Sequence, residues 1–349
     1  MTTTTISMFM SRLTQPLTNN VPISNVPKLN VMRQIQKEKV VLIMGATGAG
    51  KSKLSVDLAT LCFPSEIINS DKIQVYEGLD IVTNKISKQE QKGVPHHLLG
   101  TQDPNIDFTS YDFCDMSLGA IDSITRREHL PIIVGGSNSY LEALIDDDDY
   151  KFRSRYEFCC LWVDVKMGVL DSYVQKRVDQ MLLNGMVNEL RPFFNNNNNI
   201  NNKDYSIGIR KAIGVPEFDE YFRKEDVVDE ETKQRLLDEA INEVKVNTCN
   251  LARKQYGKIQ RLRNVKRWKI HRLDATPVFQ KHGQEEANKA WNKLVLEPSA
   301  MIIAKFLYNN NSSSSSSSSI ATTTSNNRLV SGGFSSVPLP ASSESVVCV

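Results

Sequence analysis

A phosphate-binding loop between a strand and a helix is the feature that most constrains the fold of this chain. The motif G-x-x-x-x-G-K-S directly follows an apolar run at 40–44 and consists of Gly45, Ala46, Thr47, Gly48, Ala49, Gly50, Lys51 and Ser52. The amphipathic segment after it predicts the helix that such a loop requires. Backbone N–H groups and the helix N-terminus can hold a phosphate chain, Lys51 adds a positive charge, and Ser52 can reach a Mg²⁺ ion. The motif predicts diphosphate or triphosphate binding, without saying what becomes of the phosphates.

Composition limits the class of protein. The chain has 349 residues, 40% of them hydrophobic, and a net charge of +2, so one large α/β domain with an appendage or two domains are both compatible. Its apolar runs fall short of the roughly 18 residues that span a bilayer, and we expect no membrane partner. The six cysteines form no C-x-x-C pair and no zinc spacing, which predicts reduced or buried thiols.

The two ends differ in composition from the rest of the chain. Residues 1–37 are rich in Thr and Ser, contain four basic residues and lack Asp and Glu, which is typical of an organelle transit peptide; a disordered extension is the alternative. Residues 309–349 contain a run of eight serines at 312–319. Such a segment cannot bury enough apolar area to fold, so we expect a disordered tail.

Strand and helix patterns alternate from residue 40 onward. Candidate strands lie at 40–44, 66–69, 131–134 and 158–165, with helical patterns at 52–62 and 110–128. This order predicts an α/β fold like that of P-loop NTPases, with a parallel sheet flanked by helices and a smaller helical subdomain. We expect the core at 38–170, a mainly helical insertion at 171–250, and a return to the core with C-terminal helices at 251–308.

A carboxylate follows the second predicted strand. Strand ends beside a phosphate loop face the ligand crevice of such a sheet, so Asp71 could bridge to Mg²⁺ or act as a general base. A helix cap or a surface carboxylate is the alternative. Gly135 and Gly136 end a third strand, where glycines let the backbone approach a ligand. The adjacent His96 and His97 could serve a metal or acid–base role. Adjacent histidines are awkward joint ligands on regular secondary structure, which disfavours metal binding, and a structural role for one of them is the alternative.

Two basic stretches could contact phosphate. Arg153 and Arg155 offer guanidinium groups, which suit bidentate phosphate recognition. Residues 245–272 hold ten Lys or Arg and no acidic residue. Lys254 and Gln255 lie within this segment and are candidates for phosphate binding. A charge run of this kind is either a solvated helix face or a surface that binds a nucleotide tail or RNA.

Several long stretches together resemble a known family. The segments GATGAGKSKLSVDLA, EIINSDKIQVYEGLDIVTNK, GVPHHLLG, IIVGGSNSYLEALIDD, FRSRYEFCCLWVDV and IRKAIGVPEFD resemble plant adenylate isopentenyltransferases, the cytokinin-synthesis enzymes related to tRNA dimethylallyltransferases. The resemblance covers roughly residues 38–308. It implies transfer of a dimethylallyl group from dimethylallyl diphosphate to N6 of an adenine, with Mg²⁺ as cofactor and release of diphosphate.

The resemblance also implies roles for individual residues. The phosphate loop would hold the diphosphate of the prenyl donor, and Lys51 and Arg155 would neutralise it as it departs, with Mg²⁺ held partly by Ser52. Thr47 would hydrogen-bond the bridging oxygen of the breaking C–O bond. Asp71 matches the catalytic base that accepts a proton from N6, and Thr83 matches a hydroxyl that helps to orient the adenine.

The acceptor is either a free nucleotide or an adenosine in tRNA. A C-terminal Cys₂His₂ zinc module, common in eukaryotic tRNA enzymes, is absent from the sequence, and the DKIQVY and GVPHHLLG motifs favour a free nucleotide. Among nucleotides we favour ADP or ATP over AMP, because segment 245–272 and Arg210-Lys211 could hold extra phosphates. The sequence departs from relatives at Ala49, where Thr is frequent, and at Lys254-Gln255, where an Arg-Gln pair also occurs.

Other classes of protein remain as alternatives. A P-loop kinase or NTPase would use ATP as phosphoryl donor, and a nucleic-acid-binding module would use the basic segment with an inactive loop. The intact set of Thr47, Lys51, Ser52 and Asp71 argues against loss of activity. We expect a monomer in the plastid, with the cytoplasm as the alternative location.

Overall fold

A six-stranded parallel sheet forms the centre of the structure. The computed structural model describes residues 37–195 and 204–308, and the predictions for the transit peptide and the serine-rich tail lie outside this range, apart from Lys37. The strand order is β3-β2-β4-β1-β5-β6, and every pairing is parallel. The strands are β1 (Glu38–Met44), β2 (Ser65–Asn69), β3 (His96–His97), β4 (Leu130–Val134), β5 (Tyr156–Asp164) and β6 (Ile270–Asp274). The predicted α/β class is confirmed.

Continuous apolar runs explain the central strands. Strands β1, β2 and β4 carry Val, Ile and Leu on both faces, and almost all of these side chains are fully buried. Such runs are typical of a parallel sheet covered on both sides. The four candidate strands of the sequence match β1, β2, β4 and β5 within two residues at each end.

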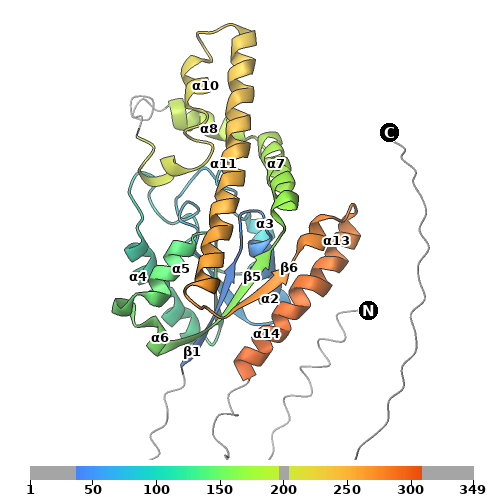
Figure 1. Ribbon diagram of the computed structural model, residues 1–349. Coiled ribbons are helices and arrows are strands. Elements are labelled where there is room, and N and C mark those ends of the chain that lie inside the picture. Colours follow the sequence, from blue (N-terminus) through green and yellow to red (C-terminus); the bar gives the residue numbers. More distant parts are fainter. Residues whose placement is uncertain (1–36, 196–203, 309–349) are drawn as a thin grey trace, which may run out of the picture. The chain divides into compact units, whose positions relative to one another are not determined.

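Helices cover the two faces of the sheet with two apolar cores. One face of β1, with Val40 and Leu42, packs against α4 (Ser110–Arg126) and α5 (Asn138–Asp146). The opposite face, with Val41 and Ile43, packs against α2 (Lys51–Leu61) and the C-terminal helices. Those helices are α12 (Thr276–Phe279), α13 (Gln284–Trp291), a π-helical turn at Asn292–Leu296 and α14 (Glu297–Tyr308). Figure 1 shows the two sets on opposite sides of the strands.

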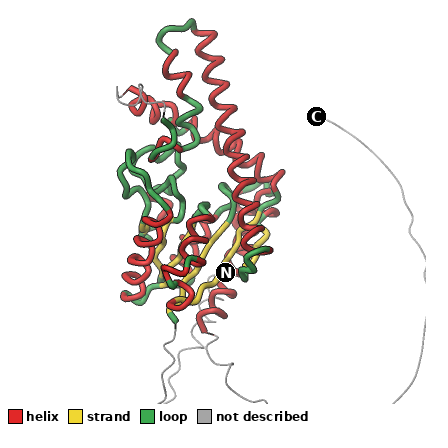
Figure 2. Tube along the Cα trace, turned by 60° about the vertical axis from the view of Figure 1, so that its left-hand side comes forward, coloured by secondary structure: helices red, strands yellow, loops and turns green. Residues whose placement is uncertain are grey.

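A helical part rises beyond the carboxyl ends of the strands (Figures 1 and 2). It contains α7 (Met167–Leu183), α8 (Met186–Asn195), α10 (Asp219–Lys224) and α11 (Glu230–Asn264). Helix α11 has 35 residues, about 50 Å at the usual rise per residue, and it runs from the helical part back along the sheet. The boundary expected at residue 250 falls inside this helix, so one continuous helix joins the two parts.

Short elements complete the path between sheet and helices. They are α3 (Lys88–Gln91), α6 (Phe152–Arg155), and two 3₁₀ turns, Asp148–Tyr150 and Gly208–Lys211. All five described cysteines are free thiols, as predicted. None of the helices in residues 37–195 and 204–308 combines the length and apolar character needed to cross a membrane.

Candidate active site

The phosphate loop connects β1 to α2 at the carboxyl edge of the sheet. Gly48 and Gly50 adopt φ angles of 82° and 97°, in the left-handed region that favours glycine. At Gly45 an added Cβ would lie 2.6 Å from the carbonyl oxygen of Val163. The sequence therefore requires glycine here for conformation at two positions and for close packing at the third.

A cavity of about 350 Å³ opens beside this loop. Five of the eight predicted loop residues line it, namely Thr47, Gly48, Gly50, Lys51 and Ser52. The remaining three, Gly45, Ala46 and Ala49, belong to the same loop but do not line the cavity. Both alanines are buried, and Ala46 presents its carbonyl oxygen to the Lys51 ammonium at 2.9 Å.

Three cations line the cavity, namely the partly buried Lys51 and Arg177 and the exposed Lys53. Burial lowers the pKa of the Lys51 ammonium to about 8, with the Asp71 carboxylate acting in the opposite direction and Arg177 adding to the decrease. Arg177 on α7 donates from Nη2 to the hydroxyl oxygen of Thr47 at 2.9 Å. Its buried Nε–H has no hydrogen-bond partner among the described residues. A buried guanidinium with a donor to spare is suited to an anionic ligand.

Arg177 is not among the site residues predicted from the sequence. It lies on the helix whose apolar positions are Val174, Val178 and Met181, where a single cation resembles an ordinary solvent-facing residue. The helix passes over the phosphate loop, since an added Cβ at Gly48 would lie 2.7 Å from a Val174 methyl group. Only this packing shows that Arg177 is directed into the cavity.

Arg155 lies outside the cavity, contrary to the prediction from the sequence. It precedes β5, whose first residue is in register with Glu38 at the start of β1. The phosphate loop follows the other end of β1, about 20 Å away at the usual strand rise. Arg155 pairs with Asp122 of α4 at 2.8 Å. The prediction that Arg155 neutralises the departing diphosphate is therefore wrong for this structure, and Arg177 occupies the position expected of that cation.

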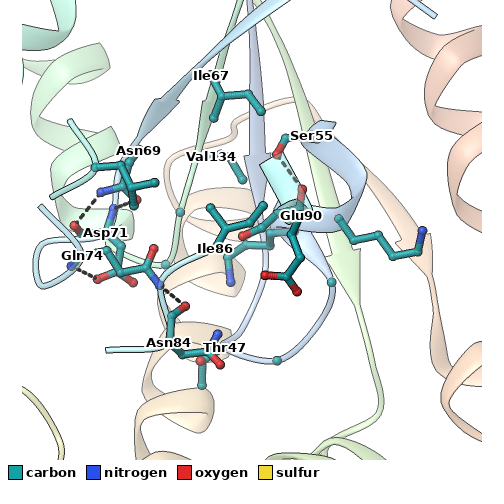
Figure 3. A pocket seen from close by; sticks show the side chains of 18 of the residues that line it. Thr47, Ser55, Ile67, Asn69, Asp71, Gln74, Asn84, Ile86, Glu90 and Val134 are labelled. Atoms are coloured by element: carbon teal, nitrogen blue, oxygen red, sulfur yellow. Dashed lines mark hydrogen bonds between the residues drawn. The ribbon is translucent and has the colours of Figure 1, made fainter. Parts of the chain in front are cut away.

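Asp71 lies in the cavity at the end of β2. Its Oδ1 accepts hydrogen bonds from the amides of Ile73 and Gln74, at 3.0 and 3.4 Å. The neighbouring Asn69 holds the backbone of this turn, because its Oδ1 accepts from the Asp71 amide and its Nδ2 donates to the Asp71 and Leu98 carbonyls. Figure 3 shows Asn69, Asp71 and Gln74 gathered on one side of the cavity. The carboxylate is thus fixed through one oxygen.

Gln255 orders the phosphate loop. This buried residue of α11 accepts a hydrogen bond from the Thr47 amide at 2.7 Å, and an added Cβ at Gly136 would lie 2.2 Å from its Nε2. Its contact is therefore with the loop backbone, whereas the sequence predicted contact with phosphate. The adjacent Lys254 is exposed and is not among the residues that line the cavity.

Thr83 lies beside the cavity and does not line it. Its hydroxyl donates to the Leu79 carbonyl at 2.7 Å, whereas its neighbour Asn84 is a lining residue. The histidine pair has structural contacts: His97 pairs with Glu66 at 2.7 Å, and His96 bonds the Val94 carbonyl at 2.8 Å. His96 also reaches the cavity wall.

The residues present are compatible with Mg²⁺. The Ser52 hydroxyl lines the cavity together with the carboxylates Asp71 and Glu90. Within the described parts of the chain, His, Cys, Asp and Glu side chains form no cluster of three that could hold a metal alone. Mg²⁺ suits such a site because it commonly binds through one or two protein oxygens, substrate phosphates and water.

Fold and site together define a P-loop α/β protein with a carboxylate in the cavity beside the loop. The sequence profile of the IPP transferase family matches residues 74–152 and 146–261. The chain is 56% identical over 272 residues to adenylate isopentenyltransferase 3, chloroplastic, of Arabidopsis thaliana, covering 78% of this chain and 80% of that protein. It is 52% identical to adenylate isopentenyltransferase 5, chloroplastic, of the same plant, covering 85% and 88%. The chain belongs to the adenylate isopentenyltransferases of the IPP transferase family.

Solved structures agree with this assignment. A eukaryotic dimethylallyltransferase that acts on tRNA has a TM-score of 0.66 at 25% identity, covering 80% of this chain and 81% of that one. The full-length tRNA isopentenylpyrophosphate transferase of Bacillus halodurans has a TM-score of 0.57 at 26% identity, covering 77% of this chain and all of the other. The fold is thus shared with enzymes that modify tRNA.

Proposed function

We propose that this protein transfers the dimethylallyl group of dimethylallyl diphosphate to N6 of ADP or ATP and releases diphosphate, the first step of cytokinin synthesis. The observation that carries this proposal is the placement of Asp71 in one cavity with Lys51 and Arg177. Two partly buried cations suit the diphosphate, and the carboxylate that follows β2 at the same edge of the sheet suits a proton acceptor.

The reaction follows from this arrangement. The N6 nitrogen attacks the allylic carbon, the carbon–oxygen bond breaks, and its electron pair stays on the diphosphate. Lys51, Arg177 and the loop amides stabilise the negative charge as it develops. The Thr47 hydroxyl oxygen accepts from Arg177, so its own hydrogen is available to the bridging oxygen of the diphosphate. Asp71 accepts the proton that N6 loses, and a positioned base of this kind typically contributes about 10²–10⁴-fold.

Mg²⁺ completes the proposed site. Ser52 would hold the ion together with diphosphate oxygens, and Asp71 or Glu90 could contact its bound water molecules. The ion would supply positive charge to the diphosphate. The protein residues supply the remaining neutralisation and the proton acceptor.

A free nucleotide is the acceptor that the comparisons support best. The relatives at 56% and 52% identity are named for adenylate, whereas the solved tRNA enzymes are only 25–26% identical. ADP or ATP is favoured over AMP because segment 245–272 carries ten basic and no acidic residues. The named relatives include chloroplastic and mitochondrial proteins, and we place this one in the plastid.

An acceptor panel tests the proposal. Purified protein with dimethylallyl diphosphate and Mg²⁺ is offered AMP, ADP, ATP and unmodified tRNA separately, and prenylated products are quantified by mass spectrometry. We expect product on ADP or ATP. Product on tRNA alone would assign the protein to the tRNA-modifying branch, and equal kcat/KM for AMP, ADP and ATP would overturn the preference among nucleotides.

A further inference from the structure

One carboxylate of the helical part fastens a turn beside the catalytic cavity. Glu189 of α8 accepts hydrogen bonds from two successive backbone amides, Ile81 to Oε1 at 3.0 Å and Val82 to Oε2 at 2.9 Å. These amides begin a helical turn whose Thr83 amide donates to the Leu79 carbonyl. A carboxylate at the start of such a turn supplies charge-assisted acceptors for N–H groups that the turn itself leaves free.

Packing reinforces this contact between the two parts. Val82 is buried, and an added Cβ at Gly214 would lie 3.0 Å from its Cγ1 and 2.9 Å from the terminal methyl group of Met186. Met186 opens α8, the helix that carries Glu189. The turn therefore meets α8 through two hydrogen bonds, and Val82 and Met186 both pack against Gly214.

The fastened turn is connected to the proposed base. Gln74 donates from Nε2 to the carbonyl oxygens of Thr83 and Asn84, at 3.1 and 3.0 Å. The Gln74 backbone amide in turn donates to Asp71. Gln74 and Asn84 both line the cavity, and Figure 3 shows the bond from the Gln74 side chain to Asn84. Movement of the turn would displace the side of the cavity that carries Asp71.

We infer that Glu189 is a positioning residue for the adenine nucleotide: through Ile81 and Val82 it holds the turn that carries Thr83 and Asn84 against Gln74. The inference rests on the proposed function, which places the adenine on this side of the cavity. The prenyl diphosphate is proposed to contact Lys51, Ser52 and Arg177, which belong to α2 and α7. We therefore expect loss of the Glu189 carboxylate to weaken binding of the nucleotide and to leave binding of the prenyl diphosphate unchanged.

Three variants test the inference. Glu189→Ala removes both acceptors, Glu189→Gln keeps one acceptor oxygen in the same shape, and Asn188→Ala changes an exposed neighbour on the same helix. For Glu189→Ala we expect hydrogen exchange at the Ile81 and Val82 amides to be about tenfold faster and KM for ADP to rise about tenfold. We expect KM for dimethylallyl diphosphate to stay unchanged, Glu189→Gln to be intermediate, and Asn188→Ala to match the wild type.

The possible outcomes separate the inference from the proposed function. If Glu189→Ala lowers Tm or kcat while both KM values stay as in the wild type, or if both KM values rise equally, the inference is overturned. Unchanged exchange at the two amides would overturn it as well. Wild-type protein without prenyl transfer would instead overturn the proposed function. Exchange and calorimetric titration with ADP would then decide the role of Glu189, because neither depends on turnover.

Discussion

Arg177 donates a hydrogen bond to the hydroxyl oxygen of Thr47 across 2.9 Å, and this contact joins helix α7 to the phosphate loop. It places a buried guanidinium where the leaving group of a prenyl transfer would develop charge. The residue reaches the loop from a helix 130 positions further along the chain. Arg155 is the natural comparison for Arg177, because the family resemblance implied the same role for it.

Replacing Arg177 should reduce activity, whereas replacing Arg155 should not. We expect Arg177→Gln to lower kcat/KM for dimethylallyl diphosphate by about tenfold to a hundredfold, since hydrogen bonds to charged groups contribute about 1.5–3 kcal/mol. Arg155→Gln should leave both kinetic constants near those of the wild type, because Arg155 pairs with Asp122 at the opposite edge of the sheet. Steady-state kinetics would check both. A large loss in Arg155→Gln with none in Arg177→Gln would restore the assignment made from the sequence.

The titration of Lys51 predicts a pH dependence of donor binding. Burial lowers its pKa to about 8, so the ammonium loses its charge as the pH rises through that value. We expect KM for dimethylallyl diphosphate to increase above about pH 8. A KM that stays flat to high pH would show that the Lys51 charge is not needed.

The same pKa has a consequence for stability. The unfolded chain keeps Lys51 protonated up to its ordinary pKa of 10.5, whereas the folded protein releases the proton at about 8. The unfolded state therefore binds more protons between these values, and this group makes the free energy of unfolding increase with pH there. In the variant Lys51→Met, denaturant titrations should lack that part of the pH dependence.

Glu66 predicts a loss of stability in acid. Hydrogen bonds from Arg127, and then from His97 and His129, outweigh burial and lower the pKa of this carboxyl to about 2. Because the folded pKa lies below the ordinary value of 4.5, the stabilisation is present above about pH 5 and is lost as the pH falls towards 2. Glu66→Gln should cost roughly 3 kcal/mol at neutral pH and flatten the acid limb. An unchanged acid limb in urea titrations would contradict this.

Two glycine substitutions should affect different properties of the protein, the activity at Gly136 and the stability at Gly119. In Gly136→Ala the new Cβ would collide with Gln255, which holds the Thr47 amide, so we expect a loss of activity through a displaced phosphate loop. Gly119 is an exposed residue inside α4 with open space at its Cβ position. Gly119→Ala should therefore raise the free energy of unfolding by about 0.5–1 kcal/mol and leave activity unchanged. If Gly136→Ala keeps full activity, Gln255 does not order the loop.

Local pattern predicted the strands that are buried on both faces, and it failed for the strands at the edges. The four expected strands are continuous apolar runs, which parallel sheets require. Strand β3 has two residues, and β6 has the sequence IHRLD with His271 and Arg272 exposed, so neither carries an apolar run. Parallel register with β2 and β5 defines them, and such long-range pairing cannot be found by local pattern.

The site was predictable where its residues adjoin strand ends. The phosphate loop and Asp71 follow β1 and β2, whose carboxyl ends meet at one edge of the sheet. Arg177 and Glu189 act from helices, and their contacts depend on how those helices cross the loops. The family resemblance assigned to Arg155 the role for which Arg177 is better placed. A motif does not show at which edge of the sheet an arginine lies.

The fate of the phosphates is the most direct test of the central claim, that the loop holds a prenyl diphosphate. ADP and ATP labelled on the terminal phosphate would each be incubated with dimethylallyl diphosphate and Mg²⁺, for the wild type and for Asp71→Asn. We predict a prenylated nucleotide that keeps its label, one diphosphate released for each product molecule, and loss of product in Asp71→Asn. Release of the labelled phosphate, or its transfer to another molecule, without prenylated nucleotide would contradict the account and indicate a phosphoryl-transfer enzyme.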